Sequence, residues 1–89
     1  MVRVRLFAVL REQAGTAEVT DVTGRTVGEL ADVLAARFGE RFASVAAVSS
    51  FVVNGERATR STAVADGDEV AILPPVSGGQ RAGRATAAR

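Results

Sequence analysis

Apolar and polar residues alternate with a period of two in the first part of the chain. The stretch VRVRLFAV (2–9) places Val, Val and Leu on one side and two arginines on the other, and AEVTDV (17–22) repeats the pattern. This period is typical of strands with one buried face. Between them, REQAGT (11–16) breaks the alternation and contains Gly15, a turn residue. We therefore predict two strands joined as a hairpin by a longer loop.

A helical period follows at residues 26–38. Thr26 and Glu29 have the spacing of a capping box. Gly39 follows the periodic stretch, where a left-handed residue commonly ends a helix. We predict a helix from Thr26 to about Phe38, and a further short helix within ERFASVAAV (40–48). The apolar face of the main helix consists of Val27, Leu30, Ala31, Leu34 and Phe38.

The remaining elements are predicted to be strands and turns. SFVVNGERA (50–58) places Asn-Gly between two extended runs, which is a strong hairpin signal. A turn is expected at 66–68, and EVAIL (69–73) alternates as a final strand. Two prolines end this strand because they cannot donate to a sheet ladder. The order of elements indicates an α+β domain with a mixed sheet and one main helix packed on one face.

The charge is divided unevenly along the 89 residues. Residues 1–79 contain eight arginines and ten acidic residues, whereas residues 80–89 contain three arginines and no acidic residue. The basic isoelectric point therefore comes from the end of the chain, and it does not indicate nucleic-acid binding. We expect one domain over residues 1–79 and a disordered Arg-rich extension over residues 80–89, which lacks large apolar groups.

The composition excludes most kinds of enzyme site. Cysteine and histidine are both absent, so the chain has no thiolate nucleophile, no imidazole base and no usual zinc ligand. No glycine-rich phosphate loop is present. No apolar run approaches the length of a membrane span, and the alternating N-terminal residues do not resemble a secretory signal. We expect a cytoplasmic protein with no metal site of its own.

Two clusters of charge each allow two interpretations. The acidic residues Asp66, Asp68 and Glu69 suit either a hard-metal site or a solvated turn whose side chains bind the local backbone. We favour the turn, because no calcium-loop spacing surrounds these residues. Arg3 and Arg5 share one strand face, which either meets an acidic partner or is simply solvated, and we favour the second interpretation.

A Gly-Gly pair follows the last predicted strand by a few residues. Such a pair is often only a flexible linker. Here Pro74 and Pro75 stiffen the exit from the domain, and Gly78-Gly79 would form a narrow segment able to enter a channel in a partner. A terminal glycine also presents an unhindered carbonyl. In a chain without Cys or His, a backbone carboxylate at this point would be the available reactive group.

With these features, the chain resembles a known family. VRLFAVLREQAGT, FVVNGE and DGDEVAILPPVSGG resemble segments of the small sulfur-carrier subunit of molybdopterin synthase, the MoaD family, whose members are similar to ThiS. The resemblance covers residues 2–79 and implies a β-grasp, ubiquitin-like fold. It also implies that a MoeB-like, E1-type adenylyltransferase, which binds ATP and Mg²⁺, activates the carboxylate of Gly79 as an acyl-adenylate. Sulfur would then replace the adenylate to give a thiocarboxylate.

The same resemblance implies where the sulfur goes. The loaded arm would enter a MoaE-like large synthase subunit, within a heterotetramer, and donate sulfur to precursor Z. Catalytic residues would belong to that partner, and this chain would bind no cofactor. Phe7 would either help to form an apolar patch for the partners or belong to the core. The partner-binding residues that the resemblance implies are Phe7, Pro74, Pro75, Val76, Ser77 and Gly78, beside the sulfur-bearing Gly79.

The chain departs from the family pattern after the second glycine. It continues with QRAGRATAAR (80–89), so Gly79 carries a peptide bond where the chemistry needs a free carboxylate. Three explanations are open: removal of these residues by a protease, which we favour, a misassigned end, or loss of the carrier function. The alternative functions are sulfur transfer for thiamin thiazole, cysteine or tRNA thiolation, and a non-catalytic ubiquitin-like binding module with a permanent tail.

Overall fold

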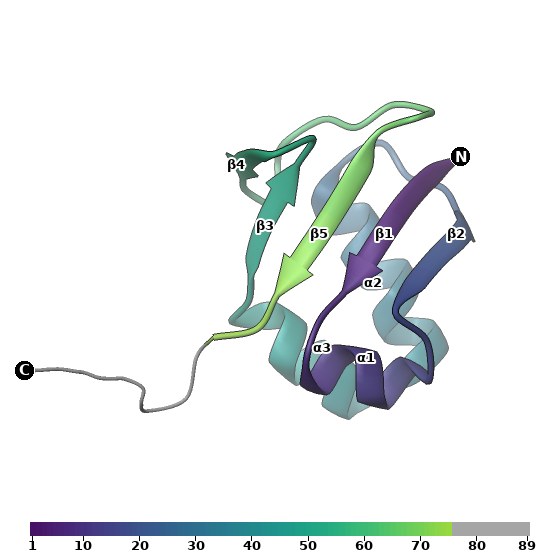
Figure 1. Ribbon diagram of the computed structural model, residues 1–89, viewed down its shortest axis with the longest axis vertical. Helices are drawn as coiled ribbons and strands as arrows, with labels where there is room; N and C mark the ends of the chain where they lie inside the picture. The colour runs from purple at the N-terminus through teal and green to yellow at the C-terminus, as the bar shows by residue number, and fades with distance from the viewer. Residues whose placement is uncertain (76–89) are drawn as a thin grey trace, which may run out of the picture.

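A computed structural model describes residues 1–75 and contains one five-stranded sheet with helices on one side (Figure 1). The order across the sheet is β2-β1-β5-β3-β4. The strands are β1 (Val2–Leu6), β2 (Glu18–Val22), β3 (Ser50–Val53), β4 (Glu56–Ala58) and β5 (Glu69–Leu73). The helices are α1 (Val9–Ala14), α2 (Val27–Phe38) and α3 (Glu40–Ala47). None of these helices is long and apolar enough to cross a membrane.

The sheet is mixed because its two central strands run in the same direction. β1 pairs in parallel with β5, with Arg3 opposite Glu69 and Leu6 opposite Ile72, and in antiparallel with β2. β3 pairs in antiparallel with both β5 and β4. The start of β1 and the end of β5 therefore lie at opposite ends of the sheet, as Figure 1 shows. This is the expected β-grasp arrangement, a mixed sheet with its main helix packed on one face.

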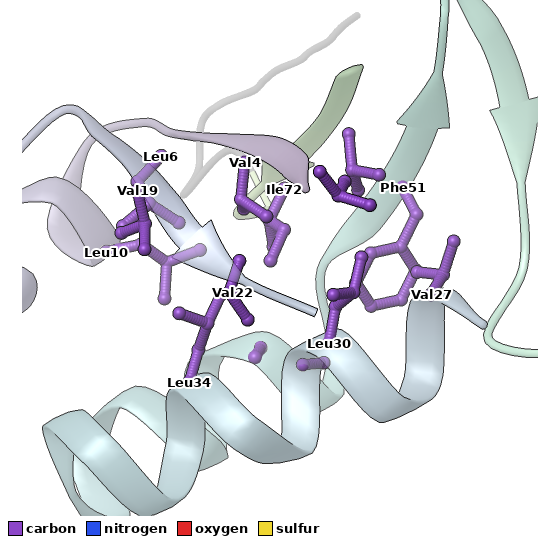
Figure 2. Close-up of a cluster of buried hydrophobic side chains, with 14 of the residues drawn as sticks. Val4, Leu6, Leu10, Val19, Val22, Val27, Leu30, Leu34, Phe51 and Ile72 are labelled. Atoms are coloured by element: carbon purple, nitrogen blue, oxygen red, sulfur yellow. The ribbon is translucent and has the colours of Figure 1, made fainter. Parts of the chain in front are cut away.

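The core lies between one face of the sheet and the helices. Alternate residues of β1 and β5 are buried, as the period of two predicts. Figure 2 shows side chains from four strands and from α1 and α2 meeting in one cluster. Its largest fully buried members are Phe42, Leu6, Leu10, Leu30, Leu34 and Ile72. The other face of the sheet is not covered by any element of residues 1–75, so its side chains are left for solvent or a partner.

The main helix forms as its sequence predicts, with two differences at its ends. Thr26 Oγ1 accepts a hydrogen bond from the N–H of Glu29 at 3.2 Å, which confirms the cap. The Glu29 carboxylate, however, accepts from the N–H of Arg25 at 2.8 Å instead of the Thr26 N–H. Gly39 has a positive φ of 106° but an extended ψ of −178°, not the expected left-handed helical geometry. The reason is that α3 begins at the next residue, so the chain must change direction at once.

The segment between the first two strands is where our prediction was wrong. Residues 9–14 form α1, although alternation suggested a strand through residue 9 and a loop after it. β1 ends at Leu6, and Ala8 reverses the chain with a φ of 54°. Leu10 is fully buried and anchors the helix, which Gly15 then closes in the left-handed conformation. A helix of six residues spans fewer than two turns, too few for its period to stand out in the sequence.

The predicted hairpin, turn and second helix are all confirmed. Asn54 and Gly55 connect β3 to β4 with φ angles of 51° and 86°, the signs that a two-residue Asn-Gly hairpin turn requires. Gly67 lies in the turn before β5 with a φ of 91°. Residues 40–47 form α3, and Phe42 of this helix lies 5.3 Å from Phe38, measured between ring centroids. Phe38 is only partly buried, at the edge of the core.

Candidate functional site: the open sheet face and the base of the arm

The predicted arm leaves the domain at the end of β5. Leu73 and Pro74 are half-buried and Pro75 is exposed, so the chain departs from the sheet as the two prolines begin. The remaining predicted site residues, Val76, Ser77, Gly78 and Gly79, lie outside the described residues, as does the expected extension at 80–89. The structure therefore places only the base of the arm, at the end of the sheet where β1 and β5 both finish.

Strand pairing lines up one residue from each strand across the open face. Arg5 lies opposite Glu18 of β2 on one side and Ala71 of β5 on the other. Ala71 in turn lies opposite Val52 of β3, which lies opposite Arg57 of β4. The resulting row is therefore acidic, basic, apolar, apolar and basic. The apolar centre of this row continues into the neighbouring row at Leu73, which lies opposite Ser50.

Phe7 lies at the same end of the sheet as the arm. Leu6 pairs with Ile72, so Phe7 follows β1 at the level of Leu73. Phe7 is half-buried and does not belong to the buried cluster of the core. Of the two locations that the sequence left open, the core and the open face, the structure therefore favours the open face. The Arg5 guanidinium carbon lies 5.8 Å from the centroid of its ring, within the range of a cation–π contact.

The two arginines of β1 are already paired within the sheet. Arg3 Nε lies 3.1 Å from a carboxylate oxygen of Glu18, and Arg3 and Arg5 lie 3.7 and 3.6 Å from the carboxylate of Glu69. All four side chains are largely exposed, so these pairs contribute little stability. They do neutralise the charge on this part of the face, which agrees with the solvated-face interpretation.

An apolar groove lies beside the base of the arm. It has a volume of about 350 Å³ and runs between the ends of β3 and β5 towards β4. The residues that line it are Ser50, Phe51, Val52, Arg57, Leu73, Pro74 and Pro75. Our sequence analysis found the two prolines but missed the groove. The Asn-Gly hairpin could have predicted part of this groove. Its two-residue turn fixes the register of β3 and β4, which places Val52 opposite Arg57 on the open face of the sheet.

The acidic turn lies at the opposite end of the sheet and serves the fold. Asp68 accepts hydrogen bonds from the side-chain amide of Asn54 at 3.0 Å and from the N–H of Ala65 at 2.9 Å. These bonds hold the pKa of the Asp68 carboxyl below its usual value, with the Asn54 bond as the main cause. Asp66 pairs with the amino group of Met1 at 3.0 Å. Within residues 1–75, no group of three His, Cys, Asp or Glu side chains is placed to hold a metal ion.

Asp21 is the second residue whose carboxyl pKa is shifted, and its contact also holds the fold together. A hydrogen bond of 2.8 Å from the Arg37 guanidinium, together with the charge of that group, lowers the pKa of Asp21. This pair joins β2 to α2 on the side of the domain away from the arm. Within residues 1–75, both carboxyl groups with shifted pKa values therefore take part in contacts that hold the fold together.

Comparison with known proteins agrees with this arrangement. Residues 4–79 match the model of the ThiS family, and the match ends at the second glycine. The chain is 41% identical over 83 residues to the molybdopterin synthase sulfur carrier subunit of Chlamydomonas reinhardtii, covering 88% of this chain and 98% of that protein. It is 39% identical over 88 residues to small archaeal modifier protein 1 of Haloferax volcanii, covering 84% and 97%.

Solved structures of related proteins also resemble this chain. The crystal structure of the Amycolatopsis orientalis BexX/CysO complex contains a chain with a TM-score of 0.74 and 29% identity, covering 89% of this chain and all of that one. A complex of subunits 1 and 2 of the molybdopterin-converting factor from Helicobacter pylori contains a chain with a TM-score of 0.60 and 25% identity, covering 88% and 97%. The span matched by the family model and the fold shared with the solved structures agree. The chain therefore belongs to the ThiS family, the ubiquitin-like sulfur carriers related to MoaD.

Proposed function

We propose that this sulfur carrier supplies sulfur for molybdenum cofactor synthesis, as the small subunit of a molybdopterin synthase. The observation that carries the proposal is the family match that ends at Gly79, six residues beyond a final strand whose exit lies beside an open, partly apolar face. The 41% identity to a molybdopterin synthase sulfur carrier subunit supports this pathway. The similarity to one subunit of a two-subunit converting factor supports a large-subunit partner.

The chemistry proceeds at the backbone and not at a side chain. A carboxylate oxygen of Gly79 attacks the α-phosphate of ATP on the adenylating partner, and pyrophosphate leaves. A sulfide equivalent then attacks the acyl carbon and displaces AMP, which leaves a thiocarboxylate. This order is needed because a carboxylate is a poor electrophile until its oxygen becomes part of a good leaving group. The chain contributes the reacting atom and its delivery, and the partners contribute catalytic groups.

Processing of the chain is part of the proposal. The ten residues after Gly79 must be removed before its carboxylate exists. Within residues 1–75, every residue of the buried cluster lies between Val2 and Ile72, so we expect the domain to fold without residues 80–89. A protein that ends at Gly79 should therefore fold like the full chain and support ATP–pyrophosphate exchange with its adenylating partner. The full chain should not support this exchange, and Gly79→Ala in the shorter form should reduce it by crowding the carbonyl.

Intact-protein mass spectrometry of the untagged chain from its own cells is the direct test. A mass that ends at Gly79, with sulfur in place of one carboxylate oxygen, would support a processed sulfur carrier. A mass that retains residues 80–89 during active cofactor synthesis, with no shorter form, would contradict the proposal and favour a non-catalytic binding module.

The choice of pathway needs a separate experiment, because relatives named CysO and small archaeal modifier protein 1 share the fold. The shorter, thiocarboxylated form should convert precursor Z to molybdopterin when mixed with the large synthase subunit from the same genome. Failure of this conversion, with sulfur transfer to a cysteine, thiamin or tRNA pathway instead, would replace the molybdopterin assignment.

A further inference from the structure

Arg57 differs from the other arginines of the open sheet face. Arg3 and Arg5 both lie within 4 Å of a carboxylate. Arg57, on the edge strand β4, makes no ion pair within residues 1–75, although it lines the apolar groove at the base of the arm. Residues 76–89 of the sequence contain no acidic side chain. Within residues 1–75, the Arg57 guanidinium is therefore without an ion-pair partner at the rim of an apolar groove, and Glu56 and Asp68, which line a neighbouring pocket with it, lie beyond ion-pair distance.

We propose that this groove binds an apolar side chain of the protein that receives the arm, and that Arg57 pairs with a carboxylate next to that side chain. This inference rests on the proposed function, because it names the contact that guides the arm into its partner. Arg57 is then a specificity-determining residue: it selects partners that present an Asp or Glu beside an apolar anchor. A planar guanidinium binds a carboxylate through two parallel hydrogen bonds, which gives orientation as well as attraction.

The composition and position of the groove support this occupant. Its lining includes Val52 and the half-buried Leu73, whereas the two grooves near the acidic turn, one of which Arg57 also lines, are lined mainly by polar and charged residues. A volume of about 350 Å³ lies at the low end of the roughly 300–1,000 Å³ that small-molecule sites occupy, so one or two side chains would fill it. Pro74 and Pro75 are among the residues that line it, so the groove adjoins the base of the arm.

Charge decides against the two nearest alternative occupants. In the full chain, residues 80–89 carry three arginines and no acidic residue, so Arg57 would repel them. In the form that ends at Gly79, the terminal carboxylate is the reacting group and has to be delivered into the partner, so it cannot stay paired with Arg57. A second copy of the chain offers acidic residues on its own open face, Glu18 and Glu69, but these are already paired with Arg3 and Arg5. A partner carboxylate is therefore the group that Arg57 lacks.

The test measures binding of the large synthase subunit from the same genome by isothermal titration calorimetry. The full chain and the form that ends at Gly79 are both used. Arg57→Glu should raise Kd by about 30-fold or more, Arg57→Gln by about tenfold, and Arg57→Lys least, because it keeps the charge. Val52→Thr, which replaces one methyl of the groove floor with a hydroxyl, should weaken binding several-fold. The matched control is Arg41→Glu on α3, an exposed arginine with no ion pair in residues 1–75, which should change Kd less than twofold.

A charge-swap cycle then identifies the partner group. Individual surface carboxylates of the large subunit are changed to Arg, and one of these variants should bind Arg57→Glu more tightly than it binds the unchanged chain. Thermal melting of each variant separates folding from binding, since Arg57 is exposed and none of its substitutions should lower Tm by more than a few degrees.

Three results would overturn the inference. Equal affinities for Arg57→Glu and Arg41→Glu would show that the groove does not recognise charge. Loss of a homodimer in size-exclusion chromatography on changing Arg57 to Glu would identify a second copy as the occupant. If the unchanged chain does not bind the large subunit at all, the molybdopterin assignment fails. The affinities of the same Arg57 variants for the adenylating enzyme then test the inference independently of the molybdopterin assignment. If these affinities equal that of the unchanged chain, the inference is rejected.

Discussion

Asn54 donates a side-chain hydrogen bond to Asp68, fourteen residues away, and this bond joins the β3–β4 turn to the start of β5. The Asn54 side-chain amide donates to Asp68 Oδ1 at 3.0 Å, and its oxygen accepts from the N–H of Glu69 at 2.9 Å. The backbone N–H of Asn54 also donates to the carbonyl of Glu69 at 2.8 Å. Asn54 therefore serves two purposes, because it also adopts the left-handed conformation of the hairpin turn. The open face depends on this connection, since it fixes β4 and Arg57 relative to β5.

The Asp68 carboxylate should make stability sensitive to acid. Its pKa is lowered in the folded protein, chiefly by the hydrogen bond from Asn54, relative to a usual value of 3.8. Its contribution is therefore complete above about pH 5 and is lost as the pH falls through the folded-state pKa, below 3.8. Asp68→Asn keeps only one acceptor oxygen, so it should lower Tm at pH 7 by a few degrees. It should also flatten the dependence of stability on pH between about 5 and 2.

Urea unfolding at a series of pH values checks this prediction. The lowered pKa of Asp21 should leave part of the acid sensitivity in the Asp68→Asn variant, and adding Asp21→Asn should remove more of it. A pH profile for Asp68→Asn with the same slope as that of the unchanged protein would show that the Asn54–Asp68 bond does not form in solution.

Gly28 in the first turn of α2 should not tolerate a larger residue. A Cβ atom there would lie 3.1 Å from the backbone oxygen of Arg60 and 3.2 Å from its Cβ. That oxygen is not free to move, because it accepts the N–H of Gly28 at 2.8 Å. Gly28→Ala should therefore destabilise the domain by about 1–2 kcal/mol, although alanine is the better helix former by about 1 kcal/mol. Urea unfolding would measure the difference.

An ordinary helix position provides the comparison for Gly28. Ala36 is exposed in the same helix, and Ala36→Gly should cost about 1 kcal/mol through helix propensity alone. One substitution replaces glycine with alanine and the other replaces alanine with glycine, and each should destabilise the domain. If Gly28→Ala proves stabilising, the loop at residues 59–62 relaxes more easily than the hydrogen bond from Gly28 suggests.

Two phenylalanines should behave differently when they are shortened. Phe42 is fully buried in the core, so Phe42→Ala should cost about 3–5 kcal/mol, a large part of the stability of a small domain. Phe7 lies on the open face against Arg5, so Phe7→Ala should cost about 1 kcal/mol or less. Phe7→Ala should nevertheless weaken binding of the large synthase subunit by about tenfold. A loss of several kcal/mol for Phe7→Ala, measured by urea unfolding, would place its ring in the core instead.

The cap of α2 should contribute measurably to stability. Thr26 Oγ1 satisfies the N–H of Glu29, and without it that donor has no partner inside the helix. Thr26→Ala should cost about 1 kcal/mol in urea unfolding, and Thr26→Ser, which keeps the hydroxyl, should recover most of the loss. Equal losses for the two variants would assign the effect to the Thr26 methyl group instead.

Local patterns explain why most elements could be predicted. The strands, the hairpin at Asn54-Gly55 and the helix capped by Thr26 depend on residues that are close in sequence, so period and turn chemistry were sufficient. The failure at residues 9–14 has the opposite cause: α1 is held in place by Leu10, which the core buries completely, and six residues carry little intrinsic signal. Phe7 could not be placed from its parity alone, because apolar residues occupy both sides of the chain from that point.

The sequence by itself determined the order of the secondary-structure elements apart from α1, the absence of Cys and His chemistry, and the Gly78-Gly79 motif, because each depends on residue identity and short-range spacing. Only the tertiary structure decided which charges are neutralised and where a partner finds an apolar surface. The parallel pairing of β1 with β5 brings Arg3 and Arg5 to Glu69, more than sixty residues away. The pairing of β5 with β3, and of β3 with β4, assembles the groove and places Arg57 at its edge without an ion pair in residues 1–75. Such relationships arise from the order of strands across a sheet, which no local pattern specifies.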